Sequence, residues 1–419
     1  MELERAKGTE DYPPEKKILR DNIVRTLIQV FERYGFDPLE TPILERYETL
    51  SAKYAGGAEI LKETFRLKDQ GDRELGLRYD LTVPLARFIA MNPQISFPFK
   101  RYQIEKVFRD GPITKSRIRE FWQCDVDIVG SKSYLADVEI IRLALDTLKE
   151  LKLKCLVKIN NRKLLNEIIE YAGVTTNTMP VILSIDKFYK IGKSGVEKEL
   201  TEKGLDKKQI NKIMSILSVN GSNDKKLKTI KNKIDKDGIA ELEKVLKYFK
   251  QGVVFDPTLA RGLSYYTGTI FEIVLEDQNL GCSVGGGGRY DNMIGSFSNN
   301  RDIPATGISF GLEPLTTALS KIEKEKKTVV DLFVIPIGYT EEALKITKKL
   351  REFNINTDID LNERNVSKNL NYANNKGIPY VLFVGEQEVK KNKVKLRNMK
   401  TGKEQIVPMN KVPGILKRK

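Results

Sequence analysis

The chain has 419 residues and a net charge of +15, and it contains no histidine. This length exceeds what one hydrophobic core usually organises, so two or three domains are expected, and 40% apolar content is typical of a soluble globular protein. The lack of histidine excludes Ser-His triads and histidine-ligated zinc, and the wide spacing of Cys124, Cys155 and Cys282 argues against a disulfide framework or a zinc knuckle.

The first elements alternate between helix and strand. Residues 14–34 have apolar side chains at helical spacing, and proline suits the first turn of that predicted helix. Residues 77–84 read as a strand running into a helix at Pro84, and residues 101–109 and 120–130 read as two further strands. A helix covering the sheet is predicted over 134–151. The N-terminus has no signal-peptide core and no apolar run has transmembrane length, so we expect a cytoplasmic protein.

The strand predicted at residues 120–130 has one unusual face. Side chains alternate along a strand, so Phe121, Gln123, Asp125 and Asp127 share one side, opposite an apolar one. The loop before it carries Lys115, Arg117 and Arg119. Cations beside an aromatic ring and carboxylates suggest a polyanion site, whereas a solvated strand face beside a basic hairpin is the commoner alternative.

Two segments hold the whole excess of positive charge. Residues 171–250 have a net charge of +7 and residues 328–419 have +8, so the rest of the chain is neutral. Residues 183–250 are helical in pattern, which predicts an inserted helical module, and residues 329–385 alternate strand and helix, which predicts a compact α/β domain with a partly parallel sheet. Two basic appendages on a neutral body suit a protein that binds a long polyanion, although solvated lysine-rich faces are a simpler alternative.

Between these segments the sheet pattern resumes at Val253. Strands are predicted over 259–275, 282–290 and 305–312. The second contains four glycines, Gly285 to Gly288, which would let the backbone approach a flat ligand, although a flexible turn is the usual meaning of such a run.

Several of these segments resemble motifs of the histidyl-tRNA synthetase family of class II aminoacyl-tRNA synthetases. GFDPLETPI at 35–43, which contains Pro42, resembles the first class II motif, FRDGPITKSRIREFWQCDVDIVG at 108–130 the second and ATGISFGLEP at 305–314 the third. RGLSYYTG and GGGGRYD resemble two segments particular to the histidyl branch. LRYDLTVP and REFWQCDVDI look like its archaeal and eukaryotic forms. The resemblance spans nearly the whole chain.

The resemblance implies an α+β fold in four parts. A catalytic body with an antiparallel sheet flanked by helices would occupy residues 1–170 and 251–326, a helical insertion contacting the tRNA acceptor arm would occupy 171–250, and an α/β anticodon-binding domain 327–419. It also implies a homodimer formed through the first motif. The activity implied is ligation of histidine to its tRNA through histidyl-adenylate, with ATP as substrate and Mg²⁺ bound by ligands that the sequence does not identify.

The resemblance assigns roles to residues on both glycine-rich and polar segments. Arg109 and Arg261 are the expected catalytic cations, because attack of a carboxylate on the α-phosphate needs charge neutralisation more than proton transfer. The residues expected to bind histidine are Asp80, Thr82, Gln123, Asp127, Arg261, Tyr265 and Tyr266, and those expected to bind ATP are Arg109, Arg117, Phe121, Gly286 and Gly287. Ordinary core packing is the alternative for the tyrosines, whereas unpaired burial of Asp80 or Asp127 would be costly.

One position departs from the family pattern. The third motif usually ends in an arginine, but this chain has Pro314 after Glu313. Either the site binds ATP without that arginine, another cation substitutes, or activity is reduced. A weakened synthetase-like paralogue that senses histidine or uncharged tRNA is therefore the main alternative, and a plain tRNA-binding scaffold is a third.

Overall fold

The computed structural model of the chain describes residues 3–52, 61–114, 117–176, 178–276, 283–298, 301–322, 325–391 and 393–416. Its contacts form two compact units, one of Met1–Glu10 with Asn22–Ile322 and one of Asp11–Asp21 with Glu323–Lys419. Cys282 and Lys115 lie outside the described residues. In the part of the chain that is described, no helix is both long enough and apolar enough to span a membrane.

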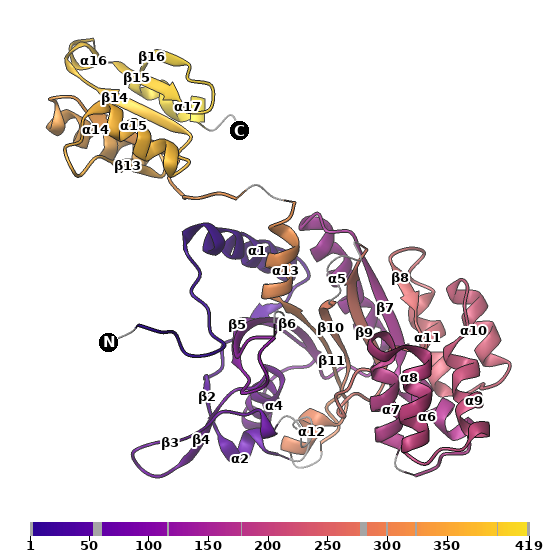
Figure 1. Cartoon of the computed structure of the whole chain (residues 1–419). Coiled ribbons are helices and arrows are strands. Elements are labelled where there is room, and N and C mark those ends of the chain that lie inside the picture. The colour runs from indigo at the N-terminus through magenta and orange to yellow at the C-terminus, as the bar shows by residue number, and fades with distance from the viewer. Residues whose placement is uncertain are drawn as a thin grey trace. The chain divides into compact units, whose positions relative to one another are not determined.

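An eight-stranded sheet forms the centre of the first unit (Figure 1). Its strands follow the order β1 (Asp37–Pro38), β5 (Phe99–Phe108), β6 (Glu120–Val129), β11 (Ala305–Gly311), β10 (Ser283–Arg289), β9 (Thr269–Leu275), β7 (Cys155–Asn161) and β8 (Val253–Phe255). Neighbours pair antiparallel except at the two edges, where β1 runs parallel to β5 and β8 to β7. The predicted antiparallel sheet is confirmed, with parallel pairs added at both edges.

Helices flank this sheet, as predicted. Helix α1 (Pro14–Arg33) buries Ile23, Leu27 and Phe31, which recur at the spacing of one helical face. Helix α5 (Tyr134–Glu150) packs against β6, β7 and β11, and its first turn is capped by the Ser133 hydroxyl. Helices α4 (Thr82–Met91) and α12 (Met293–Phe297) pack against each other in a shared core.

A small sheet, not predicted from the sequence, precedes α4. It has the order β2 (Leu44–Arg46), β4 (Glu74–Leu77) and β3 (Arg66–Lys68), beside the short helix α2 (Tyr47–Leu50). The predicted strand-to-helix junction exists here, but the strand ends at Leu77 and the helix begins at Thr82, two residues before Pro84.

Helices also fill the chain between β7 and β8. They are α6 (Arg162–Tyr171), α7 (Thr178–Asp186), α8 (Phe188–Glu202), α9 (Lys207–Leu217), α10 (Asn223–Lys231) and α11 (Asp237–Leu246). The helical pattern predicted over 183–250 is therefore confirmed, and Figure 1 shows these helices gathered beside β7 and β8. Helix α8 is interrupted at Gly192, where φ is 68°. The division of the chain into four domains stays a prediction.

The second unit contains a five-stranded sheet. Its order is β13 (Thr357–Ile359), β12 (Leu332–Pro336), β14 (Tyr380–Val384), β15 (Lys393–Asn398) and β16 (Glu404–Pro408). The first three strands are parallel and the last two antiparallel, so the predicted partly parallel sheet is confirmed. Its helices are α14 (Thr340–Glu352), α15 (Val366–Asn375), α16 (Glu386–Lys390), the 3₁₀ turn η2 (Met409–Lys411) and α17 (Val412–Leu416). Separate apolar clusters contain Val334 and Phe333, which are successive residues on opposite faces of β12.

One predicted strand is wrong in its first half. The sequence predicts a strand over 259–275, but β9 begins only at Thr269 and residues 256–268 form a loop. Arg261 in this loop has φ of 54°, in the left-handed region that a strand cannot contain. The glycine-rich segment, by contrast, forms a strand, β10, rather than a flexible turn, with one shift of register against β9 between Ser283 and Gly285.

Candidate active site

The polar face of β6 is the floor of a cavity of about 660 Å³. Gln123, Asp125 and Asp127 line it, whereas Cys124 and Val126 on the other face are fully buried. The alternation read from the sequence is therefore confirmed. The polar face of β6 therefore points into the cavity and is not an outer surface of the molecule.

Asp127 on this polar face is almost fully buried. Arg101, directly opposite on β5, is fully buried and places Nη2 2.7 Å from an Asp127 carboxylate oxygen. The Tyr290 hydroxyl donates a hydrogen bond to the other oxygen. Burial raises the pKa of Asp127, and Arg101 opposes that rise. The inference from unpaired burial therefore does not apply to Asp127, because Arg101 supplies a charge partner.

Asp125 is the next inward carboxylate, and the sequence reasoning gave it no role. It is 3% exposed, and its Oδ1 atom has no hydrogen-bond partner among the described residues. Burial raises the pKa of Asp125 to about 7, and the nearby Asp127 adds to the rise while Arg101 opposes it. The cavity thus contains a carboxyl group that changes charge near neutral pH.

Two further predicted residues stand at the start of α4. One carboxylate oxygen of Asp80 accepts from the backbone N–H groups of Thr82 and Val83, at 3.1 and 2.9 Å. Asp80 thus has a structural duty at the helix start, and its side chain also lines the cavity together with Thr82. On β6, the Gln123 amide donates to the Ser309 hydroxyl at 3.0 Å, while its own oxygen has no hydrogen-bond partner among the described residues.

Arg109 follows β5 and reaches the cavity between two aromatic rings. Its guanidinium carbon lies 4.1 Å from the centroid of the Tyr79 ring and 4.9 Å from that of Phe121. Phe121 is not among the cavity-lining residues, so it contacts the site through Arg109. Arg117 lines the cavity and forms an ion pair with Glu63 at 2.5 Å, whereas Arg119 pairs with Asp110 and does not line it.

Arg261 approaches from the loop 256–268 on the other side of the cavity. Its Nη1 atom would lie 2.2 Å from a Cβ placed at Gly286, so the guanidinium rests directly on the glycine strand β10. A carboxylate oxygen of Glu272 on β9 lies 3.6 Å from the same nitrogen. The lack of a side chain at Gly286 thus lets the Arg261 side chain approach the backbone of β10 closely. At Gly287 a Cβ would meet the backbone oxygen of Gly307 at 1.9 Å, so this position needs glycine for the β10–β11 pairing itself.

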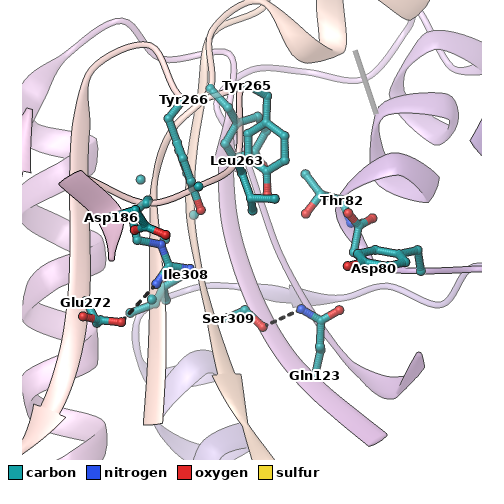
Figure 2. Close-up of a pocket in the computed structure, with 18 of the residues that line it drawn as sticks. Asp80, Thr82, Gln123, Asp186, Leu263, Tyr265, Tyr266, Glu272, Ile308 and Ser309 are labelled. Carbon is teal, nitrogen blue, oxygen red and sulfur yellow. Dashed lines mark hydrogen bonds and ion pairs between the residues drawn. The ribbon is translucent and has the colours of Figure 1, made fainter. Parts of the chain in front are cut away.

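Three neighbouring tyrosines, Tyr265, Tyr266 and Tyr290, line the cavity. The rings of Tyr265 and Tyr266 lie 4.8 Å apart, and Tyr265 meets Tyr290 edge-on at 6.0 Å. Figure 2 shows Asp80 and Thr82 on one side of Tyr265 and Tyr266, and Glu272 with Asp186 on the other. Burial raises the pKa of the Tyr265 and Tyr290 hydroxyls well above the ordinary value, so both remain protonated donors.

The helices between β7 and β8 complete the wall, which the sequence reasoning did not foresee. Leu183 and Asp186 of α7 line the cavity, as do three lysines, Lys187, Lys190 and Lys203. Lys187 pairs with Glu199 at 2.7 Å, and Lys203 donates to the Pro180 carbonyl at 2.6 Å. The cavity is therefore acidic on its β6 side and bounded by lysines on its helical side.

The third motif spans β11 and the start of α13 (Leu312–Leu319). Pro314 occupies the first turn of the helix, as expected for proline, and it is not among the cavity-lining residues. The Glu313 carboxylate accepts a hydrogen bond from the Trp122 backbone N–H, at 3.2 and 3.3 Å to its two oxygens. This motif thus fixes the start of β6, and Pro314 brings no charge to the cavity.

Comparisons with known proteins agree with the motifs. A family model for histidyl-tRNA synthetase matches residues 8–315, and one for an anticodon binding domain matches residues 331–419. Histidine–tRNA ligase 1 of Bacillus cereus is 46% identical over 99% of this chain and 100% of that relative, and histidine–tRNA ligase 2 of Shouchella clausii is 42% identical over 98% and 99%. The crystal structure of histidyl-tRNA synthetase from Nostoc sp. PCC 7120 has a TM-score of 0.88 and 29% identity, and the match covers 100% of this chain and 99% of that one.

These relatives are bacterial, so the likeness of two segments to archaeal and eukaryotic forms stays a prediction. The motifs, the antiparallel sheet and the C-terminal α/β unit agree with the sequence matches over nearly the full length. The chain belongs to the histidyl-tRNA synthetase family.

Proposed function

We propose that the chain is a histidine–tRNA ligase. In the first step an oxygen of the histidine carboxylate attacks the α-phosphorus of ATP, the bond to the β-phosphate oxygen breaks, and pyrophosphate leaves. A hydroxyl of the tRNA acceptor end then attacks the carbonyl carbon of the adenylate and AMP leaves. The observation that carries the proposal is one cavity in which Arg109 and Arg261 share the space with buried carboxyls and tyrosine hydroxyls. Family membership and the names of the relatives support it.

Histidine binding is assigned to the acidic side of the cavity. The α-ammonium group needs acceptors, and Asp80, Thr82 and Gln123 line one region of the wall with oxygens available. The neutral imidazole has one donor and one acceptor, which Asp127 can match together with Tyr265 and Tyr266. A site that pairs both ring nitrogens leaves buried polar groups unsatisfied when another side chain enters, so it rejects other amino acids strongly.

ATP binding is assigned to the arginines and the glycine strand. Arg109 and Arg261 would neutralise the α-phosphate, and Arg117 would meet the outer phosphates after exchanging its present partner Glu63. Gly286 and Gly287 line the cavity, and Gly286 lets the Arg261 guanidinium rest on β10, where the two would meet the nucleotide together. Phe121 would stack on adenine. Pro314 stands where the family has an arginine that contacts ATP, so another cation would have to take its place. Lys190 on α8 is a candidate, because it lines the cavity and is exposed.

Mg²⁺ is proposed as the companion of ATP. The described residues contain no group of three or more metal-ligating Cys, Asp or Glu side chains. Mg²⁺ commonly binds through one or two carboxylates, water and substrate phosphates, so this sparse donor set fits an ion that arrives with the nucleotide. When bound, the ion neutralises phosphate charge. Its protein ligands remain unassigned.

The larger assignments follow the family. We propose that the helices between β7 and β8 contact the tRNA acceptor arm, that the C-terminal unit reads the anticodon, and that the protein acts in the cytoplasm. A homodimer through the first motif is supported by two exposed apolar side chains, Ile43 at the end of the motif and Leu44 directly after it, which are 43% and 51% exposed. Sedimentation equilibrium of the full chain tests the dimer.

The decisive experiment is histidine-dependent exchange of pyrophosphate into ATP. Replacing Arg261 with alanine should lower the exchange rate by about 10² to 10³, the usual loss when one preorganised transition-state contact is removed. Replacing the exposed Arg25 of α1 with alanine is the control and should leave the rate unchanged. A near-normal rate in Arg261→Ala would reject the role of this residue. Histidine binding without exchange in the unmodified protein would instead indicate the sensor.

A further inference from the structure

The loop that carries Arg261 is held by side chains rather than by a strand ladder. The Asn160 amide donates to the carbonyls of Pro257 and Leu259, at 3.1 and 2.8 Å. The Arg162 Nη2 atom donates to the carbonyls of Arg261 and Leu263, at 2.8 and 2.7 Å. Four alternate carbonyls of the loop are thus bonded to two side chains at the end of β7.

Both side chains are rigidly placed. Asn160 is fully buried at the end of β7, and Arg162, the first residue of α6, is 5% exposed. The backbone N–H of Arg162 donates to the Gly268 carbonyl at 2.8 Å, which fixes its backbone to the far end of the same loop. The planar guanidinium of arginine then presents its donors in a fixed geometry.

This support acts on a strained residue. Arg261 has φ of 54°, a region that costs a non-glycine residue free energy and persists only where its surroundings determine the conformation. One of the two Arg162 bonds is to the carbonyl of Arg261 itself and the other is two residues further along. Together they limit the peptide rotations that would swing the Arg261 side chain away from Gly286.

We propose that Arg162 is a positioning residue that acts through Arg261, with Asn160 holding the preceding part of the loop. The inference rests on the catalytic role proposed for Arg261. Neither side chain is among the residues that line the cavity, so Arg162 does not contact a bound substrate directly, although its charge also acts on Tyr266 and Asp186 of the cavity wall. A displacement of about 1 Å at a reacting group can cost on the order of 10² in rate, which is the scale of effect available here.

The test is a double-mutant cycle read by histidine-dependent pyrophosphate exchange. Arg162→Ala should lower kcat by roughly tenfold to 10², with a smaller change in the KM for histidine, because the misplaced group acts in the transition state. In an Arg261→Ala background the same change should lower kcat by less than about twofold. An equal loss in both backgrounds, or no loss in the unmodified background, would overturn the proposal.

Matched controls separate positioning from folding. Asn161 is the same residue type as Asn160, adjacent to it and equally buried, but its amide donates to Glu241 on α11 and its oxygen caps α6 by accepting from the Lys163 backbone N–H, so neither group bonds to the loop 256–268. Asn160→Ala should lower kcat while Asn161→Ala should not, even where their thermal midpoints fall together; equal kcat losses would contradict the proposal. Both loop bonds of Arg162 come from one nitrogen, Nη2, and a lysine ammonium also presents one nitrogen with several donors, so Arg162→Lys should recover part of the Arg162→Ala loss. If Arg261→Ala alone leaves exchange normal, the catalytic role of Arg261 fails and the positioning role of Arg162 fails with it, whereas a loss in Arg261→Ala without one in Arg162→Ala overturns the Arg162 proposal alone.

Discussion

Arg101 and Asp127 form a buried ion pair at the cavity wall, and the nearby Asp125 has no ion pair with an arginine among the described residues. Arg101 is fully buried and directly opposite Asp127 in the β5–β6 register. Burial favours the neutral form of Asp125 and raises its pKa to about 7. Arg101 opposes this rise, but it also neutralises Asp127, whose negative charge raises the pKa of Asp125 further.

A pH-dependent stability follows for Asp125. The ordinary pKa of this group is 3.8 and the folded value is about 7, so between these values the folded state holds a proton that the unfolded state has lost. The stabilisation by the neutral form is complete below about pH 4 and is lost as pH rises to about 7. Urea unfolding at pH 5, 6, 7 and 8 should therefore show the unmodified protein losing stability relative to Asp125→Asn as pH rises.

The comparison reports the interacting pair Asp125 and Asp127, and no imidazole contributes to it because this chain has no histidine. Asp224→Asn, an exposed aspartate on α10, is the charge-matched control and should run parallel to the unmodified protein. Parallel curves for Asp125→Asn would instead mean that the Asp125 pKa is not raised in the folded state.

Residue roles were predictable where a strand pattern exposes them and not elsewhere. The polar side chains of 123, 125 and 127 stand out by alternation, and Arg101, Gln103 and Glu105 on the partner strand carry the same signal. Lys187, Lys190 and Lys203 had no such signal, because only the tertiary fold brings helices α7 and α8 to the cavity.

Among the elements, the loop 256–268 and strand β10 act together, because the loop supplies Arg261 and the strand supplies the glycine on which its guanidinium rests. The loop was predicted as a strand because its residues alternate, but the left-handed backbone at Arg261 and the side-chain bonds from β7 replace the ladder. Local propensity cannot reveal such bonds, since their donors lie about a hundred residues earlier in the chain. Elements with strong periodicity, such as α1, α5 and β6, were predictable within a few residues.

Gly286→Ala tests the contact between these two elements. An added Cβ would meet the end of the flexible Arg261 side chain, so the guanidinium should move while the strand keeps its pairing. We expect histidine-dependent exchange to fall by roughly tenfold to 10², as for a misplaced catalytic group, with little change in the thermal midpoint. Gly71→Ala, where the nearest atom would lie 3.5 Å away, is the matched control. Normal exchange in Gly286→Ala would mean that Arg261 does not act from its position over β10.

For the whole molecule, the two basic segments seen in the sequence fall on the helices between β7 and β8 and on the C-terminal unit. Between α10 and α11 lies a cavity of about 710 Å³ whose wall includes Lys228, Lys231, Lys247 and Lys250. The two basic segments could be predicted from the composition of the sequence. The grouping of residues 11–21 with the C-terminal unit has no signal in the sequence.

The salt dependence of tRNA binding tests the role of this lysine-lined cavity. If Lys228 and Lys250 each contact a phosphate, replacing both with glutamine should reduce the slope of log affinity against log salt by roughly 1 to 2, because fewer counterions are released. Filter binding from about 50 to 200 mM salt measures the slope. Arg142→Gln with Lys149→Gln, two exposed cations of α5, is the charge-matched control. Equal slopes for the two double variants would indicate a general charge effect.

The eight-stranded sheet ends on both sides in very short strands, since β1 has two residues and β8 has three. A long outer strand would present a row of unpaired backbone groups on which another chain could build amyloid-like pairing. The edge strands β1 and β8 are too short to act as such a template, so the sheet does not promote aggregation through its edges. Any association at the β1 border must depend on complementary side chains, which makes it selective for a correctly shaped partner.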